Sequence, residues 1–166
     1  FYTMTHQPKA YKKFVATAAT ATLVATAVAP VAASAASDFV DVNKNYEEAV
    51  NYLVEQGITE GMPGNKFGTD LNIKRGDAAV FIARALKLDT ENAEDQNFSD
   101  LNNRVKGAVN AVVAEGIASG KGLGKFNPDD LITRQEMAKM LSNAYELTSD
   151  KDAPFTDVNK NWMKYV

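Results

Sequence analysis

The sequence contains no cysteine and only one histidine, His6, among its 166 residues. Disulfide bonds, thiolate metal sites and cysteine nucleophiles are therefore excluded. His6 lies in a segment that we expect to be cleaved off, so no histidine base is predicted for the mature protein. Gly-x-Ser-x-Gly and phosphate-loop motifs are also absent. We predict a protein that is not an enzyme and that has no cofactor or metal site. A carboxylate pair for glycoside hydrolysis is the one catalytic option left open.

The charge balance is mildly acidic. The whole chain has a formal net charge of −3, and the segment that we expect to be cleaved holds Lys9, Lys12 and Lys13 but no acidic residue. The mature protein is therefore more acidic than the whole chain. This speaks against nucleic acid as a partner, because nucleic-acid binding needs a basic face. An anionic ligand would need a local cationic pocket.

Residues 1–35 are interpreted as a secretory signal peptide with a few extra residues before Met4. A basic region is followed by an apolar stretch from Phe14 to Val31 and by an Ala-Ser-Ala cleavage site at 33–35. A membrane-spanning helix is the alternative, but Pro30 interrupts the stretch, whose many Thr and Ala residues make it only mildly hydrophobic. We predict a secreted protein with no membrane contact after cleavage.

The rest of the chain is a repeat with a shift of about 59 residues. The aligned pairs include Phe39 with Phe98, Asp41 with Asp100, Gly57 with Gly116, Gly61 with Gly120, Phe67 with Phe126 and Arg75 with Arg134. A third copy starts at Phe155-Thr156-Asp157. We therefore predict complete copies at 38–88 and 97–147, linkers at 89–96 and 148–153, and the start of a truncated third copy at 154–166.

Each copy is predicted to fold as helix, loop and helix. The first helices have apolar residues with helical spacing, namely Tyr46, Ala49, Val50, Leu53 and Val54 in one copy and Val105, Ala108, Val109, Val112 and Val113 in the other. Gly57 and Gly116 follow at the position of a left-handed C-cap. The loops are rich in glycine, and we expect Phe67 and Phe126 to plug the core.

The second helices are predicted to begin near Arg75 and Arg134. Thr133 and Glu136 have the spacing of a capping box. Lys74 replaces the threonine in the first copy, where only Asp77 still favours a helix N-terminus. The predicted buried stripes are Ala78, Phe81, Ile82, Ala85 and Leu86 in the first copy and Met137, Met140, Leu141, Ala144 and Tyr145 in the second. One helix pair cannot bury two apolar faces, so we predict an all-α fold of stacked repeats.

The Phe-x-Asp-Val/Leu-Asn element, the Gly-Ile-x-x-Gly turn and Ile132-Thr133-Arg134-Gln135-Glu136 resemble the surface-layer homology (SLH) domain. The resemblance covers Asp38 to Val166, and the leader is similar to that of Bacillus-type surface-layer proteins. It implies three repeats in a pseudo-threefold helical bundle. It also implies non-covalent binding of a secondary cell-wall polysaccharide, often one with a pyruvate ketal.

The same resemblance implies that Arg75 and Arg134 bind the ketal carboxylate, because arginine holds a carboxylate by two parallel hydrogen bonds. The free amides of a helix N-terminus would add to the attraction. The other predicted ligand residues are the first-turn acids Asp77 and Glu136, the turn glycines Gly61 and Gly120, the aromatic residues Tyr46 and Trp162, and the hydroxyl acceptors Asp41 and Asp100.

Each assignment has an alternative. The arginines can pair with surface acids, the glycines can serve backbone geometry, and the two aromatic residues can belong to the core. Arg75-Gly76-Asp77 spells an adhesion tripeptide, although adhesion motifs work at loop tips. Asp41-x-Asn43-x-Asn45 resembles the start of a calcium loop, but Tyr46 stands where that loop needs glycine. Asn caps of the first helices are the alternative there.

We therefore predict a secreted anchor that attaches a surface-layer protein to the cell wall. Its predicted partners are the secondary polysaccharide, peptidoglycan as a second wall ligand, and other surface-layer subunits through regions outside this chain. The alternative is the anchor of an extracellular polysaccharide hydrolase whose catalytic domain lies beyond Val166.

Overall fold

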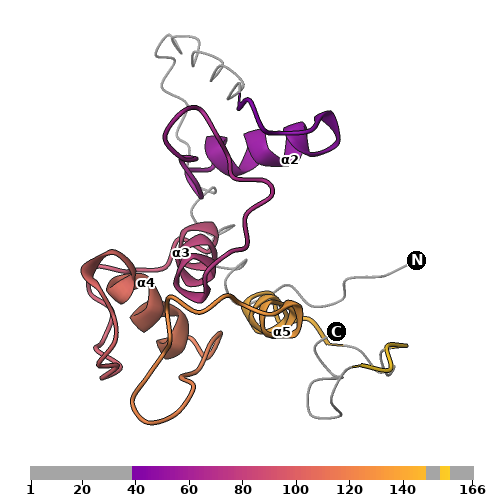
Figure 1. Cartoon of the computed structure of the whole chain (residues 1–166). Coiled ribbons are helices and arrows are strands. Elements are labelled where there is room, and N and C mark those ends of the chain that lie inside the picture. Colours follow the sequence, from indigo (N-terminus) through magenta and orange to yellow (C-terminus); the bar gives the residue numbers. More distant parts are fainter. Residues whose placement is uncertain (1–38, 149–153, 158–166) are drawn as a thin grey trace, which may run out of the picture. The chain divides into compact units, whose positions relative to one another are not determined.

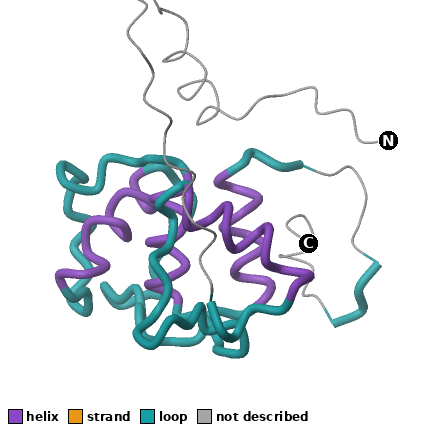
Figure 2. Tube along the Cα trace, turned by 90° about the horizontal axis from the view of Figure 1, so that it is seen from above, coloured by secondary structure: helices purple, strands orange, loops and turns teal. Residues whose placement is uncertain are grey.

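A computed structural model describes residues 39–148 and 154–157 of the chain (Figure 1). The predicted leader and Trp162 lie outside the described residues. The helices are α2 (Lys44–Glu55), α3 (Arg75–Ala85), α4 (Asn103–Ala114) and α5 (Arg134–Ala144). The described ranges contain isolated bridges but no strand, as Figure 2 also shows. The all-α prediction is therefore confirmed.

The described residues form two compact units, residues 39–71 and the residues from 72 onward. The first unit holds α2, and the second holds α3, α4 and α5. The division falls inside the first predicted copy, between its two helices. Each unit is described by itself below.

The two first helices begin and end in the same way. The side chains of Asn43 and Asn102 are N-caps that accept hydrogen bonds from the second residue beyond them. This confirms the capping alternative for these asparagines. Gly57 and Gly116 follow with φ of +67° and +71°, a left-handed conformation that glycine adopts without a Cβ penalty.

The two second helices begin where predicted but are capped differently. Thr133 and Glu136 form the predicted capping box of α5. Lys74 makes no side-chain cap for α3. The backbone instead pairs Lys74 with Leu131 in a bridge, and the Ile132 amide donates to the carbonyl of Ile73 at 3.2 Å. The start of α3 is therefore tied to the loop of the second copy.

An aspartate holds each glycine-rich loop closed. The two oxygens of Asp41 accept from the amides of Phe67 at 2.7 Å and Gly68 at 2.8 Å. Asp100 does the same for Phe126 at 3.0 Å and Asn127 at 2.9 Å. Each loop also brings two phenylalanine rings into tilted or edge-on contact, with centroids 5.7 Å apart for Phe39 and Phe67 and 5.6 Å apart for Phe98 and Phe126. The repeat therefore encodes the same local fold twice.

The main core lies in the unit from residue 72, where α3 packs against α4, as the two neighbouring ribbons in Figure 1 show. Its largest fully buried side chains are Phe126, Val105, Val109 and Val112. The buried stripe of α3 was partly wrong. Phe81, Ala85 and Leu86 are only half-buried, whereas Ala79 and Ala83 are buried with Ala78 and Ile82. The short side chains let α4 approach closely, and periodicity alone did not distinguish this face from the neighbouring one.

The predicted stripe of α5 was also only partly right. Met140 and Ala144 are buried, with exposed fractions of 2% and 4%. Met137 is half-buried, while Leu141 and Tyr145 keep 39% and 40% of their surface exposed. The apolar stripe of α5 is therefore buried at Met140 and Ala144 and only partly covered along its neighbouring edge, at Leu141 and Tyr145.

Candidate ligand-binding site

Arg75 is the first residue of α3, yet it is almost fully buried, with 5% of its surface exposed. Its Nε donates to the Phe126 carbonyl at 3.1 Å, and its Nη2 donates to the Ser119 carbonyl at 2.7 Å. The guanidinium also lies 4.7 Å from the centroid of the Phe126 ring. Arg75 therefore fastens the second helix of one copy to the loop of the next.

Glu136 is the acid that faces this guanidinium. Its Oε1 lies 3.5 Å from Nη1 of Arg75 and 3.0 Å from Nζ of Lys121. Its Oε2 accepts from the amide of Thr133 at 2.9 Å as part of the capping box. The site thus brings together two predicted ligand residues, Arg75 and Glu136, and adds Lys121.

Lys121 was not among the predicted ligand residues. It follows Gly120 in the glycine-rich loop and aligns with Met62 in the first copy, so the repeat gives no signal for it. Its side chain is 32% exposed and also lies 3.7 Å from Asp130.

The first two backbone amides of α3 already have hydrogen-bond acceptors. The amides of Arg75 and Gly76 donate to the carbonyls of Asp130 and Pro128, both at 2.8 Å. The expectation of free amides at this helix start was therefore wrong, because a neighbouring loop supplies the acceptors. A Cβ on Gly76 would lie 3.0 Å from Pro128 Cβ, so this glycine serves the close approach of the loop.

The Arg75-Gly76-Asp77 tripeptide offers little to a receptor. Arg75 and Gly76 are buried, and Asp77 Oδ1 lies 2.6 Å from Nη1 of Arg104. This geometry does not suit the adhesion alternative. Asp77 also lies in an ion pair of its own, separate from the pairing of Glu136 with Arg75.

Arg134 has the same motif position as Arg75 and the opposite environment. It is exposed at the first position of α5 and forms no ion pair within the described ranges 39–148 and 154–157. The guanidinium is thus open to an incoming anion. The two arginines share a sequence motif, but only Arg134 has its donors available.

The other predicted ligand residues have structural partners. The Phe39 ring lies where a Cβ on Gly61 would stand, and the Phe98 ring lies 2.5 Å from the corresponding position at Gly120. These glycines therefore make room for an aromatic ring in their own copy. The carboxylate oxygens of Asp41 and Asp100 accept hydrogen bonds from backbone amides of the loops.

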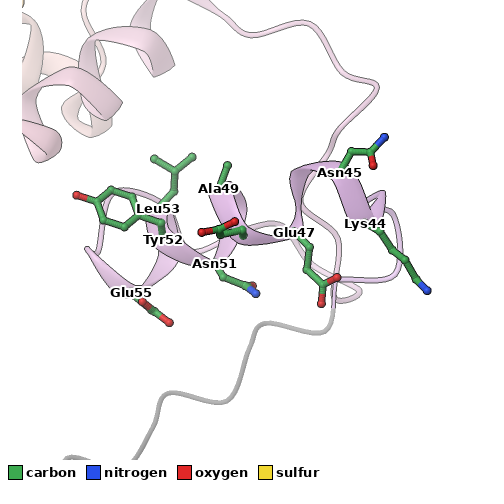
Figure 3. A pocket seen from close by; sticks show the side chains of 9 residues that line it. Lys44, Asn45, Glu47, Ala49, Asn51, Tyr52, Leu53 and Glu55 are labelled. Atoms are coloured by element: carbon green, nitrogen blue, oxygen red, sulfur yellow. The ribbon is translucent and has the colours of Figure 1, made fainter.

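Tyr46 is 59% exposed on α2. A hollow along this helix is lined mostly by polar and acidic side chains, with Tyr52 and Leu53 at one end and Lys44 and Asn45 at the other (Figure 3). Tyr46 is not among the residues that line this hollow, and its role as a platform stays a prediction. Trp162, the other predicted platform, lies outside the described residues.

Several pKa values follow from these contacts. Burial lowers the pKa of Arg75, while Glu136 and Asp130 oppose that shift. Burial raises the pKa of Glu136, but hydrogen bonds from Thr133 and Lys121 outweigh it and leave the pKa below its ordinary value. Arg75, Lys121, Glu136 and Asp130 together carry two positive and two negative formal charges. This cluster is therefore a balanced network that fixes the loop, and it offers donors mainly through Lys121.

The described residues contain no group of three or more histidine, aspartate or glutamate side chains placed to hold a metal ion. Nor does any helix in the described ranges have the length and apolar character to cross a membrane. What the arrangement offers chemically is hydrogen bonding and charge at Arg134 and Lys121, the latter on a loop that Arg75 and Asp100 hold by hydrogen bonds.

Comparison with known proteins agrees with the repeat. The family model described as "S-layer homology domain" matches residues 38–79 and 97–138. The chain is 37% identical over 159 residues to the surface-layer 125 kDa protein of Lysinibacillus sphaericus, covering 92% of this chain and 13% of that protein. It is 35% identical over 159 residues to an S-layer protein of Bacillus licheniformis, covering 92% of this chain and 18% of that protein.

Weaker similarity extends to an enzyme. An endoglucanase of Bacillus sp. strain KSM-635 is 33% identical over 94 residues, which are 57% of this chain and 10% of the enzyme. The chain thus spans less than a fifth of each of these three relatives.

Proposed function

Because the chain belongs to the S-layer homology domain family, we propose that it anchors a surface-layer protein to the bacterial cell wall without a covalent bond. The proposed ligand is a secondary cell-wall polysaccharide with a carboxylate substituent, such as a pyruvate ketal. The observation that carries the proposal is the family match over both repeats, together with the similarity to surface-layer proteins over most of the chain. In this function the chain is a secreted structural anchor and not an enzyme.

Arg134 is proposed as the principal contact. It is exposed at the first position of a helix, where its guanidinium can give a carboxylate two parallel hydrogen bonds. Lys121 is proposed as a second cation, since part of its side chain stays exposed while it contacts Glu136. Arg75 would act chiefly by holding the loop that carries Lys121, because two of its nitrogens are bound to carbonyls.

The remaining predicted ligand residues are proposed to support binding within their own units. Tyr46 would stack on a sugar ring, since its side chain is exposed. Asp41, Asp100, Gly61 and Gly120 would act by fixing the loops whose amides and phenylalanine rings they contact. Asp77 would keep Arg104 in place.

The test is co-sedimentation of the mature chain with purified cell-wall sacculi, before and after chemical removal of the secondary polysaccharide. Binding that is lost on removal supports the proposal. Equal binding to stripped sacculi would make peptidoglycan the ligand, and no binding to either would favour a purely structural role. Arg134→Ala should weaken binding roughly tenfold or more, because a charge-assisted bidentate contact is lost.

Arg84→Ala is the matched control, since Arg84 is another exposed arginine, on α3. It should leave binding unchanged. Arg75→Ala is expected to weaken binding only together with a loss of folded structure, which far-UV circular dichroism measures. If Arg134→Ala and Arg84→Ala bind alike, the proposed contact is wrong even where the chain itself binds the wall.

The second candidate function is the wall anchor of an extracellular polysaccharide hydrolase. The similarity to an endoglucanase favours it, although that match covers a smaller part of the chain. Sequencing the gene beyond Val166 distinguishes the two: a catalytic domain supports the hydrolase anchor.

A further inference from the structure

The linker between the two copies, residues 89–96, comes closest to α4 at Gly107, in the middle of that helix. The carbonyl oxygen of Thr90 lies so near Gly107 that a Cβ on this glycine would overlap it. Glycine is among the least favourable residues inside a helix, and Gly107 is not one of the glycines with a positive φ. The helix therefore has glycine at this position because the backbone of the linker needs the room.

Two side chains of α4 bind the far end of the same linker. Asn110 is polar but only 3% exposed, and its side-chain oxygen accepts a hydrogen bond from the amide of Gln96 at 3.2 Å. Nζ of Lys106 lies 2.7 Å from Oδ2 of Asp95. At the near end, Leu88 packs against the hydrophobic core. The linker is therefore fastened to the second copy before, within and at the end of its length.

The aligned positions of the other copies do not suit this contact. Gly107 aligns with Glu48 of α2 and, at the shift of 57 residues that applies to the third copy, with Lys164. The linker before the third copy, residues 148–153, is also two residues shorter. A residue with a Cβ has no room for a carbonyl placed like that of Thr90. The contact is therefore specific to the junction between the first and second copies.

We propose that the 89–96 linker is a strap locked onto α4 by Gly107, and that this contact protects the junction from local opening and from proteases. Polar, acidic linkers between compact segments are ordinarily preferred sites of cleavage. A strap that is held at several points is cut only when it opens, so its cleavage rate follows the free energy of opening. The proposal does not depend on the wall-binding function.

Gly107→Ala tests the strap, because its two effects have opposite signs. Alanine favours a helix, but its Cβ would displace the Thr90 carbonyl. We expect endoproteinase Glu-C to cut the full chain after Glu91 and Glu94 about five-fold faster or more in this variant, as mass spectrometry of the fragments measures. Glu48→Ala, at the aligned position of α2, is the matched control and should leave cleavage of the linker unchanged. Far-UV circular dichroism shows whether each variant keeps its helices.

Hydrogen exchange tests the strap in the unaltered chain. The Gln96 amide should exchange about ten-fold more slowly than an unstructured amide or slower still, and Gly107→Ala should remove this protection. Rapid exchange of Gln96 in the unaltered chain would show that the linker is not held and would overturn the proposal. Equal or slower cleavage of Gly107→Ala would do the same, because helix propensity alone would then decide the outcome. If this variant loses its helical signal, the exchange of Gln96 in the unaltered chain decides.

Discussion

α2 and α4 are the same element of two copies, but they differ sharply in burial. Both have an asparagine N-cap, a left-handed glycine after the last turn and an aspartate that binds the following loop. α2 buries only Val50, whereas α4 buries six residues, including Val105 and Val109. The difference arises because α4 packs against α3, while the apolar face of α2 is not covered within its own unit.

The comparison separates two sources of structure. Caps, turns and the aspartate–loop bonds are short-range, so each copy specifies them by itself. Burial of a helix face depends on a neighbouring copy, as in other repeat proteins. Substitutions at aligned positions should therefore have equal effects where they touch local contacts and unequal effects where they touch the interface between copies.

The largest expected inequality is between the two loop phenylalanines. Phe126 is fully buried, so Phe126→Ala should cost about 4 kcal/mol of unfolding free energy. Phe67 is half-buried, and Phe67→Ala should cost about half as much. Urea unfolding followed by far-UV circular dichroism measures both. Equal losses would mean that the first copy has a core as well covered as the second.

The next comparison uses the two motif arginines. Arg75→Ala should cost about 3 kcal/mol, because it leaves the Ser119 and Phe126 carbonyls without their donors and removes one of the two cations beside Glu136. Arg134→Ala should change stability by less than about 0.5 kcal/mol, since its side chain is exposed and has no ion pair in the described residues. The same urea experiment applies. A large loss for Arg134→Ala would show that it too is held between copies in solution.

The helix caps give a smaller effect. Thr133→Ala removes the half of the α5 capping box in which the Glu136 amide donates to the Thr133 hydroxyl, while the backbone amide of residue 133 can still donate to Glu136, and it should cost about 1 kcal/mol. Lys74→Ala, at the aligned position of α3, should cost less, because Lys74 makes no side-chain cap and only a solvent-exposed ion pair with Asp129. Thermal unfolding of the two variants gives the order, and the reverse order would contradict the assignment of the caps.

The smallest expected difference between the two copies is in how their stability depends on pH at acid pH. Backbone amides of Phe67 and Gly68 lower the pKa of Asp41 below its ordinary value of 3.8. Burial raises the pKa of Asp100, but the amides of Phe126 and Asn127 lower it overall. Each carboxylate therefore adds stability that is complete above its ordinary pKa and is lost as the pH falls through the lowered folded value.

Both copies should weaken together below about pH 4, because the aspartate contact is local and present twice. Acid unfolding of Asp41→Asn and Asp100→Asn, followed by circular dichroism, checks this. Each variant should lose part of the pH dependence. A change in only one of them would show that the two loops are not equivalent.

The helix starts at Arg75 and Arg134, the capping box and the left-handed glycines were predictable because each depends on residues within a few positions. The exposure of Arg134 and the burial of Arg75 could not be predicted from the sequence. Their motifs are alike, and the difference comes from carbonyls of Ser119 and Phe126, more than 40 residues away in the chain from Arg75. Lys121 was missed for the same reason, since only folding brings it to Glu136.

The packing of α3 against the second copy determines where the chain can be divided if a module is to be transferred to another protein. A boundary in the 89–96 linker would coincide with the boundary between the sequence repeats. It would separate α3 from α4 and expose Val105 and Val109 to solvent. A cut between Leu71 and Asn72 would leave these contacts intact, because α3 and α4 both lie in the unit that begins at Asn72. A transplantable module of this protein is therefore offset from its repeat, and it begins in the middle of the first copy.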